Sequence, residues 1–126
     1  MRIVLLLASL SISVCLGAEA PKFPLRSGTY QFQWRDAEFM EGPGFRVRVE
    51  INGLKIRVIN QHSERNGVPI GELASGVVMW HSGFSKWIIG RDDSDTTASS
   101  VGTCDVTSPY VVDLKTREIW TCEWGP

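Results

Sequence analysis

The stretch FRVRVEINGLKIRVIN, residues 45–60, is the clearest structural pattern in the chain. Apolar and polar side chains alternate on both sides of Asn52-Gly53, and strict alternation places one set on each face of a strand. Asn-Gly is the favoured pair for a two-residue type I′ turn, in which both central residues need a positive φ. We therefore predict a β-hairpin whose inward-facing pairs are Ile51 with Leu54, Val49 with Ile56, and Val47 with Val58.

The outer face of this predicted hairpin carries its charges. The same register places Glu50 opposite Lys55, and it places Arg48 opposite Arg57, a like-charge pair that destabilises a sheet. With Arg46 nearby, the three arginines define a basic strand face that suits an anion or an acidic partner. The alternative is a solvated outer face on which Glu50 relieves the repulsion. No aromatic residues alternate with these arginines, which argues against a nucleic-acid surface.

Residues 1–20 have the features of a cleavable secretory signal peptide. A positive Arg2 precedes an almost wholly apolar run, and the small residues Ala18 and Ala20 stand where a signal peptidase needs them, so cleavage is expected after Ala20. The apolar run is too short for a membrane span. Cys15 leaves a lipoprotein alternative open, although Val14 replaces the small residue expected before a lipidated cysteine. A secreted or periplasmic protein is the expectation.

The remaining residues, 21–126, have the length of a single domain with one core. The whole chain has 13 basic and 14 acidic side chains, so no bulk charge points to a polyanion or a membrane surface. Cys104 and Cys122 remain after cleavage, and an even pair in an exported chain predicts one disulfide. A zinc site is not expected, because His62 and His81 lack ligand spacing around them.

Short alternating segments with turn signals between them indicate an all-β fold without helical periodicity. We predict a single antiparallel meander of about seven strands, forming a curled sheet or a small barrel with one disulfide. Large side chains are expected to fill its interior rather than leave a ligand cavity: Tyr30, Phe32, Trp34, Trp120 and Trp124. The expected strands cover residues 28–35, 45–51, 54–60, 73–81, 85–90, 110–114 and 117–124.

A second hairpin is expected around a type II′ turn at residues 82–85, with Gly83 first of the two central residues. Its register pairs Val78 with Ile89, Met79 with Ile88, Trp80 with Trp87, and His81 with Lys86. Both faces are apolar, so this hairpin is either covered on both sides or open to a partner on one. Gly76 suggests a bulge or a close backbone approach. Aromatic anchors favour a binding surface here, made of Trp80, His81, Phe84, Lys86 and Trp87; the alternative is that both tryptophans belong to the core.

Residues 92–97 concentrate oxygen ligands that suit calcium, with Asp92, Asp93 and Asp95 as candidates. The glycine and glutamate of an EF-hand loop are missing, and a solvated acidic loop is the alternative. No nucleophile elbow, zinc-protease motif or phosphate-binding glycine loop occurs. An enzyme is therefore not the leading expectation, and no cofactor is predicted.

Ala74-Ser75-Gly76, followed by Trp87-Ile88-Ile89-Gly90, resembles in part the Ser-Gly … Trp-x-Lys-Gly signature of the periplasmic C-type lysozyme inhibitors. The resemblance implies an exported, disulfide-bonded β-barrel that blocks an enzyme cleft with its serine and lysine. Ser75 matches the serine, but Ile89 stands at the lysine position. The family's early cysteine is absent, and the match covers under a fifth of residues 21–126.

These observations favour an exported, non-enzymatic binding module that acts on a protein or small ligand through the aromatic hairpin and the basic strand face. One alternative is a periplasmic inhibitor or immunity-type protein that blocks an enzyme such as a lysozyme. A small hydrolase or a ligand carrier with a barrel cavity is a second alternative. No nucleic acid and no membrane span of the mature chain are expected.

Overall fold

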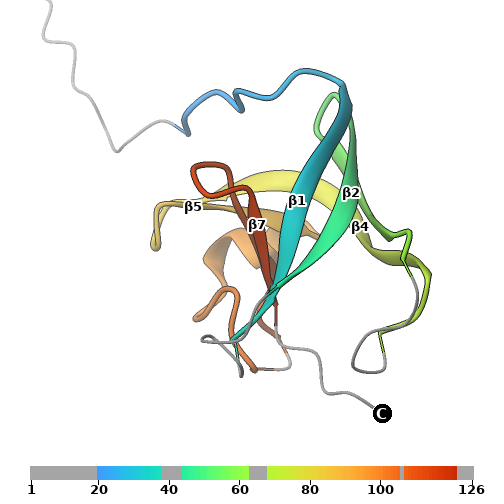
Figure 1. Cartoon of the computed structure of the whole chain (residues 1–126). Helices are drawn as coiled ribbons and strands as arrows, with labels where there is room; N and C mark the ends of the chain where they lie inside the picture. Colours follow the sequence, from blue (N-terminus) through green and yellow to red (C-terminus); the bar gives the residue numbers. More distant parts are fainter. Residues whose placement is uncertain (1–19, 38–43, 63–67, 106, 122–126) are drawn as a thin grey trace, which may run out of the picture.

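The computed structural model describes residues 20–37, 44–62, 68–105 and 107–121, and these form a closed β-barrel (Figure 1). The strands follow one another around the barrel in sequence order. They are β1 (Gly28–Asp36), β2 (Phe45–Asn52), β3 (Lys55–Asn60), β4 (Gly71–His81), β5 (Lys86–Gly90), β6 (Tyr110–Asp113) and β7 (Glu118–Thr121). The predicted all-β meander is confirmed, and of its two forms the chain adopts the barrel. Nowhere in the described ranges is there a helix with the length and apolar character to cross a membrane.

The barrel closes between its first and last strands, which the sequence left undecided. β1 pairs with β7 from Gln33 opposite Glu118 to Asp36 opposite Thr121, and the amide of Gln33 donates to the Arg117 carbonyl at 2.8 Å. This pair is parallel, whereas all the other neighbouring strands pair antiparallel. The reason is the odd number of strands, because the first and seventh strands of an up-and-down meander run in the same direction. The predicted antiparallel meander is therefore confirmed, and the parallel pairing arises only at the seam that closes it.

The β2–β3 hairpin has the predicted facing but not the predicted register. Val49 lies opposite Val58 and Ile51 opposite Ile56, so every partner is shifted by two residues from the expectation. Gly53 has a φ of 63°, whereas Asn52 and Leu54 have no positive φ, as in a type II′ turn with glycine first. A two-residue shift keeps the side chains within β2 and β3 on their predicted faces, but the prediction that Leu54 faces inward is wrong. The shift also replaces the expected Arg48–Arg57 pair with Glu50 opposite Arg57, which is electrostatically favourable, and leaves Leu54 exposed in the turn.

The β4–β5 hairpin has the predicted register, from Val78 opposite Ile89 to His81 opposite Lys86. Its turn differs from the prediction: residues 82–85 form a four-residue loop in which Ser85, with a φ of 53°, takes the left-handed conformation. Gly83 has no positive φ, so the type II′ assignment is wrong there. The pairing survives because a two-residue and a four-residue loop around the same centre give the same register.

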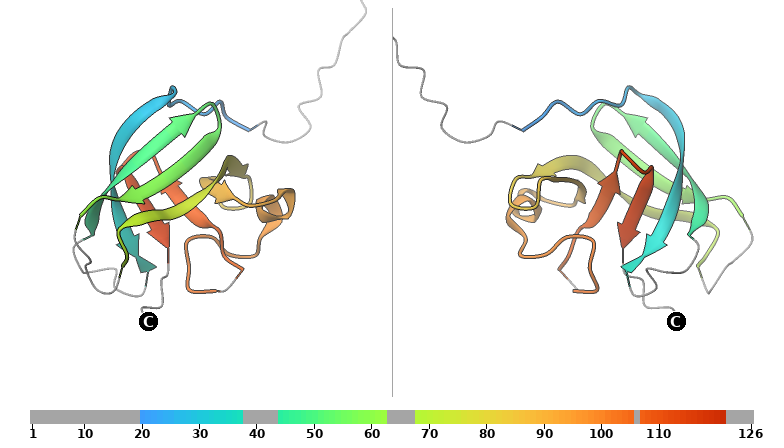
Figure 2. Two further views of the ribbon diagram at one scale, coloured as in Figure 1. Left: turned by 90° about the vertical axis from the view of Figure 1, so that its right-hand side faces the viewer. Right: turned by 60° about the vertical axis from the view of Figure 1, so that its left-hand side comes forward.

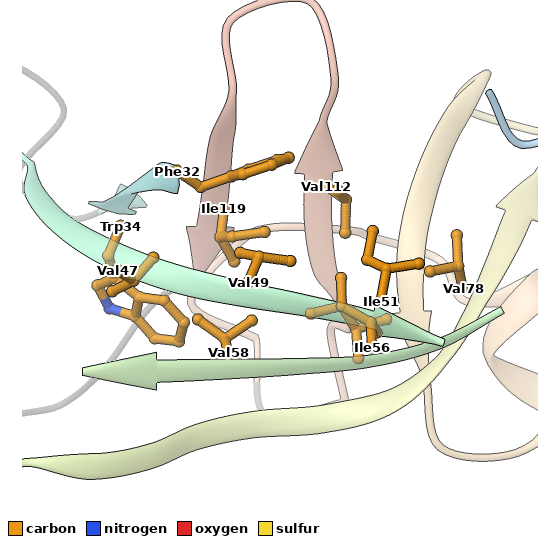
Figure 3. Packing of buried hydrophobic residues seen from close by; sticks show 11 residues of the cluster. Phe32, Trp34, Val47, Val49, Ile51, Ile56, Val58, Val78, Val112 and Ile119 are labelled. Carbon is orange, nitrogen blue, oxygen red and sulfur yellow. The ribbon is translucent and has the colours of Figure 1, made fainter. Parts of the chain in front are cut away.

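Side chains fill the interior of the barrel, as Figure 3 shows. Phe32 and Trp34 of β1 point inward and are 1% and 2% exposed, as predicted, while Tyr30 is half-buried against them. Trp120 does not point inward: on β7 the interior positions belong to Ile119 and Thr121, both 0% exposed. The expectation that Trp120 fills the core is therefore wrong, and Trp124 lies outside the described residues. The core cluster consists of Phe32, Trp34, Val47, Val49, Ile51, Ile56, Val58, Val78, Ile89, Val112 and Ile119.

Two irregularities shape β4. A Cβ at Gly76 would lie 2.4 Å from the Gly90 carbonyl oxygen, so the close backbone approach predicted for this glycine is present. The register shift lies elsewhere, between Val58 and Ile59 of β3, where Ala74 and Glu72 are the successive partners. Leu73 is thus the extra residue, and the bulge predicted at Gly76 is not there.

Residues 91–105 and 107–109 leave the barrel and fold back over its outer wall (Figure 2). This segment contains the short 3-10 helix η2 (Asp93–Thr97), which contacts both β4 and β5. Beneath the segment, the outward-facing Ile88 and His81 are 0% and 3% exposed. The apolar character of both faces of the β4–β5 hairpin therefore reflects cover on both sides.

Cys104 is half-buried in the segment that follows η2. Its predicted disulfide partner, Cys122, lies outside the described residues, as does most of the predicted signal peptide. The disulfide and the cleavage site stay predictions.

Candidate functional site

The two tryptophans of the predicted aromatic surface pack edge to face, with ring centroids 5.1 Å apart. Trp87 is half-buried against the core, and Phe23 from the N-terminal segment packs on it at 5.1 Å. Residues 20–27 run across this end of the barrel (Figure 1). Trp87 is therefore covered by the core, by Phe23 and by Trp80, whereas Trp80 is half-buried and has Trp87 as its aromatic neighbour.

His81 has a structural environment. Its side chain is 3% exposed; Nδ1 accepts from the Phe84 amide at 3.2 Å, and Nε2 lies 2.8 Å from the Ala98 carbonyl. Because a carbonyl only accepts, this pair of contacts requires the proton on Nε2. The imidazole thereby ties the β4–β5 turn to the segment after η2. Phe84 and Lys86 remain exposed at the turn, Phe84 at 45%, so the structure brings only part of the predicted surface to solvent.

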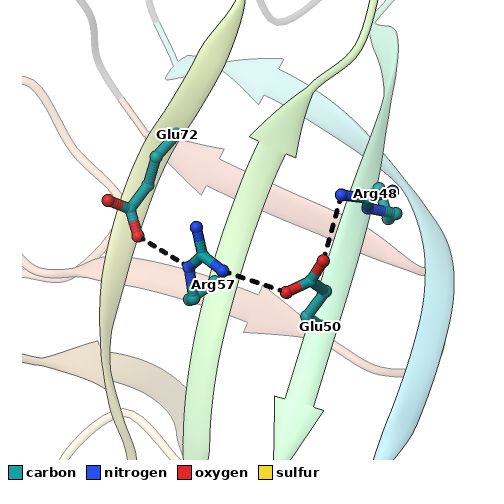
Figure 4. Close-up of polar contacts among 4 residues, drawn as sticks. All are labelled: Arg48, Glu50, Arg57 and Glu72. Atoms are coloured by element: carbon teal, nitrogen blue, oxygen red, sulfur yellow. Dashed lines mark hydrogen bonds and ion pairs between the residues drawn. The ribbon is translucent and has the colours of Figure 1, made fainter.

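The predicted basic strand face is an ion-pair ladder rather than a cluster of like charges (Figure 4). Glu50 accepts from Arg48 at 3.0 Å and from Arg57 at 3.2 Å, and the Nε of Arg57 donates to Glu72 at 3.1 Å. The hydrogen bond and charge of Glu72 raise the pKa of the exposed Arg57 above its ordinary value. Arg57 thus has two carboxylate partners, while Arg48 has one, which it shares.

Arg46 and Arg48 border a groove of about 270 Å³ on the outer wall of β1 and β2. Arg46 is exposed and makes no ion pair with the described residues. The Nε of Arg48 is enclosed and has no hydrogen-bond partner within the described part of the chain. Side chains from β1 and from the end of β3 complete the groove: Thr29, Tyr30, Gln31, Gln61 and His62.

The buried amide of Asn60 holds one wall of this groove in place. Its Nδ2 donates to the Pro69 carbonyl at 3.0 Å, and its Oδ1 accepts from the His62 amide at 3.2 Å. Asn60 is 1% exposed, and a buried amide with both ends bonded fixes the backbone around it. The chain therefore leaves β3 in a defined direction, which carries Gln61 and His62 to the side of Arg46.

The sequence did not identify Gln31 or His62 as partners of these arginines. Gln31 lies directly opposite Arg48, and this register depends on the connection between β1 and β2, which carries no sequence signal for it. His62 belongs to the polar connection after residue 60, and polar loops often carry function. That general signal was present, but nothing in the sequence showed that Gln61 and His62 lie beside Arg46 and Arg48.

The acidic segment uses two of its carboxylates to build local structure. Asp92 caps η2 by accepting from the amide and hydroxyl of Ser94, and these bonds lower the pKa of Asp92. Asp95 is 7% exposed and accepts from the Arg91 amide at 2.8 Å. Asp93 is exposed. Across the described residues, no group of three or more metal-ligating side chains is placed to hold an ion.

The residues that resemble the lysozyme-inhibitor signature do not share one surface. Ser75 is exposed on the outer face of β4, whereas Ile89 is 4% exposed and belongs to the core. The side chain at position 89 therefore lies on the inner face of the sheet and not beside Ser75 on the outer face.

No family model matches this sequence, and neither curated proteins nor solved structures give a match. The function must therefore be inferred from the groove itself. Two guanidinium groups, two carboxamides, an imidazole and two hydroxyl-bearing residues line it, and the neighbouring carboxylate of Glu50 is shared with Arg57 outside it. Such a set offers many donors and net positive charge, which suits a carboxylate or a phosphate.

Proposed function

We propose that this protein is an exported, non-enzymatic binding module that recognises an anionic group of a partner through the groove bordered by Arg46 and Arg48. The supporting observation is that these two arginines share one groove, with a single shared carboxylate nearby. Guanidinium groups bind carboxylates and phosphates through paired, charge-assisted hydrogen bonds. Arg57 is not part of this site, because Glu50 and Glu72 occupy its guanidinium.

The filled barrel supports a surface binder over a carrier. The core side chains labelled in Figure 3 point into the interior of the barrel, and the buried members of that cluster are at most 4% exposed. A carrier of small ligands needs an internal cavity, and side chains occupy that volume here. Binding at an outer groove needs no change in the core.

Replacing Arg46 or Arg48 with glutamine is expected to weaken anion binding about 10- to 150-fold, because each change removes a charge-assisted hydrogen bond worth about 1.5–3 kcal/mol. Binding is to be followed by amide and arginine side-chain NMR shifts during separate titrations with an acetylated hexaglutamate peptide and with inorganic phosphate. We expect shifts at Gln31, Arg46, Arg48 and His62, and weaker binding at high salt. The two probes separate a carboxylate-bearing partner from a phosphate-bearing one.

The matched control is Lys86→Gln, which removes the same charge from the exposed β4–β5 turn. Its anion affinity should equal that of the unaltered protein. A loss with Lys86→Gln but not with Arg46→Gln would move the site to the aromatic hairpin, and shifts spread evenly over all exposed cations would leave no site at all.

Export makes a separate prediction about the mature N-terminus. Intact-mass measurement of the protein recovered from the periplasm or the medium should match a chain that begins at Pro21 and carries no lipid. Residues 20–22 are exposed, and Phe23 is the first described residue that packs on the core, so this cleavage removes no core contact. A lipid-modified Cys15, or an unprocessed chain, would contradict the prediction.

A further inference from the structure

The wall of the barrel is incomplete beside the first half of β4. β5 ends at Gly90, opposite Val77, whereas β4 begins at Gly71. Gly76 lies against Gly90, but residues 71–75, which lie beside β3 on one side, are paired with no β5 residue on the other. This leaves an open strand edge, about 17 Å long at the usual rise per residue, inside an otherwise closed sheet.

The backbone groups of Ser75 point into this gap. The Val78 amide donates to the Leu54 carbonyl at 2.7 Å, so the backbone N–H of Val78 points toward β3. In an antiparallel pair, bonded and non-bonded positions alternate. Ser75, paired with Arg57 three residues away from Val78, is accordingly a non-bonded position whose N–H and C=O point away from β3. They face the place where β5 would lie if it continued.

After β5 the chain turns away from this gap through specific hydrogen bonds. After Gly90, the Arg91 amide donates to the buried Asp95 carboxylate at 2.8 Å and not to β4. The backbone then folds into η2, where the Asp95 amide donates to the Asp92 carbonyl at 3.2 Å. β5 is thus terminated by specific bonds, and its continuation beside Ser75 is left vacant.

A groove of about 410 Å³ occupies this position. Its far rim is formed by residues 103–105 and 107–109. The Gly102 amide donates to the Pro109 carbonyl at 2.8 Å, and the Thr103 amide donates to the Ser108 Oγ at 3.1 Å, so these two amides bond within this segment and not to β4. Ala74, Ile89 and Tyr110, which pack on or belong to the core, supply an apolar floor.

We propose that this groove, bounded by the open edge of β4 and by residues 103–105 and 107–109, binds an extended peptide segment of a partner protein as an added strand. The peptide would continue the β4–β5 ladder and exchange backbone hydrogen bonds with Ser75. Strand addition draws its affinity from such main-chain bonds and its selectivity from alternate side chains. One side chain in two would face the floor of Ala74, Ile89 and Tyr110 and should be apolar.

The charges at this groove point to a neutral segment. Arg91 lines it and pairs with Asp95 at 3.7 Å, while Asp105 contributes the opposite charge. This balance differs from that of the arginine-bordered groove, which lies on β1 and β2. The two sites are built from different strands, so this proposal stands whether or not the anion site does.

The test is an NMR titration of the full mature chain with the neutral peptide acetyl-Thr-Val-Thr-Val-Thr-amide. The Ser75 amide should exchange rapidly in the free protein, become protected on binding, and show contacts to the peptide backbone. Ser75→Pro removes that N–H and is expected to weaken binding about tenfold, whereas Ser75→Ala keeps the N–H and should bind normally. Proline is tolerated at an open strand edge, where its missing N–H breaks no ladder bond.

Thr103→Trp provides a second variant if Ser75→Pro does not fold, because it fills the groove from the exposed far rim without touching β4. It should abolish peptide binding and leave phosphate binding unchanged. Equal loss with Ser75→Ala and Ser75→Pro would mean that the hydroxyl is recognised and would overturn strand addition. Peptide-induced shifts confined to the arginine-bordered groove would also overturn it. So would protection of the Ser75 amide that rises with protein concentration in the absence of peptide, because a second copy of the chain would then occupy the edge.

Discussion

Ile119→Ala should lower the free energy of unfolding by about 2–5 kcal/mol, the usual cost of truncating a fully buried aliphatic side chain and leaving a cavity. Ile119 is 0% exposed and lies in the core cluster opposite Val112. Urea denaturation followed by far-UV circular dichroism measures the change, and the slope of the transition should stay constant because the same surface is exposed on unfolding.

Its neighbour Trp120 is the matched control, because the sequence analysis predicted that this larger residue would fill the interior. Trp120 lies on the outer wall, half-buried, with the Arg35 guanidinium 5.1 Å from its ring centroid. Trp120→Ala loses this contact and partial burial, at a cost of about 1–2 kcal/mol. The smaller side chain should therefore matter more. A larger loss with Trp120→Ala would mean that β7 presents its other face to the core.

The difficulty on β7 has a physical origin. Alternation identifies the inner face only where the outer face is polar. Residues 91–105 and 107–109 cover part of the outer wall; a Cβ at Gly102 would lie 3.4 Å from that of Trp120. Both faces of β7 therefore carry apolar groups, and size alone favoured the tryptophan. On β1–β3 the outer face is solvated, and there the alternation correctly predicted which side chains point inward.

Register was harder to predict than facing for a related reason. Asn52-Gly53 permits a turn with both residues central or one with Gly53 and Leu54 central, and both place Ile51 and Ile56 inward. The second arrangement brings Glu50 opposite Arg57, while the first opposes two arginines. Local turn statistics do not include that electrostatic difference, which is set by cross-strand pairs.

The anion groove shows the same division between local and distant information. Arg46 and Arg48 alternate on one strand, so their shared face was predictable from spacing alone. Gln31 arrives through the β1–β2 pairing and His62 through the turn fixed by Asn60. The open edge of β4 was not predictable at all, because it arises where the chain leaves the sheet after Gly90, at the hydrogen bond from the Arg91 amide to the Asp95 carboxylate.

Removing the predicted disulfide should lower the free energy of unfolding by about 3 kcal/mol, the chain-entropy estimate for a loop of about 18 residues between Cys104 and Cys122. Gly102 packs against Val111 and Trp120, and each cysteine follows this contact by two residues. The bridge would thus anchor residues 91–105 and 107–109, which cover His81 and Ile88 and border the proposed peptide groove. The Cys104→Ser/Cys122→Ser double variant, compared with the unaltered protein by urea denaturation with and without reductant, measures this contribution.

Reductant should destabilise the unaltered protein and leave the double variant unchanged. Peptide binding should be weaker in the reduced protein and in the double variant than in the unaltered, oxidised protein, while phosphate binding persists in both. The reason is that the rim at residues 103–105 and 107–109 depends on the bridge, whereas the wall of β1 and β2 does not. Alkylation of both cysteines in the unreduced, folded protein, together with an unfolding midpoint that ignores reductant, would show that the two thiols are unlinked. The rim would then depend only on its own hydrogen bonds and on the packing of Gly102 against Val111.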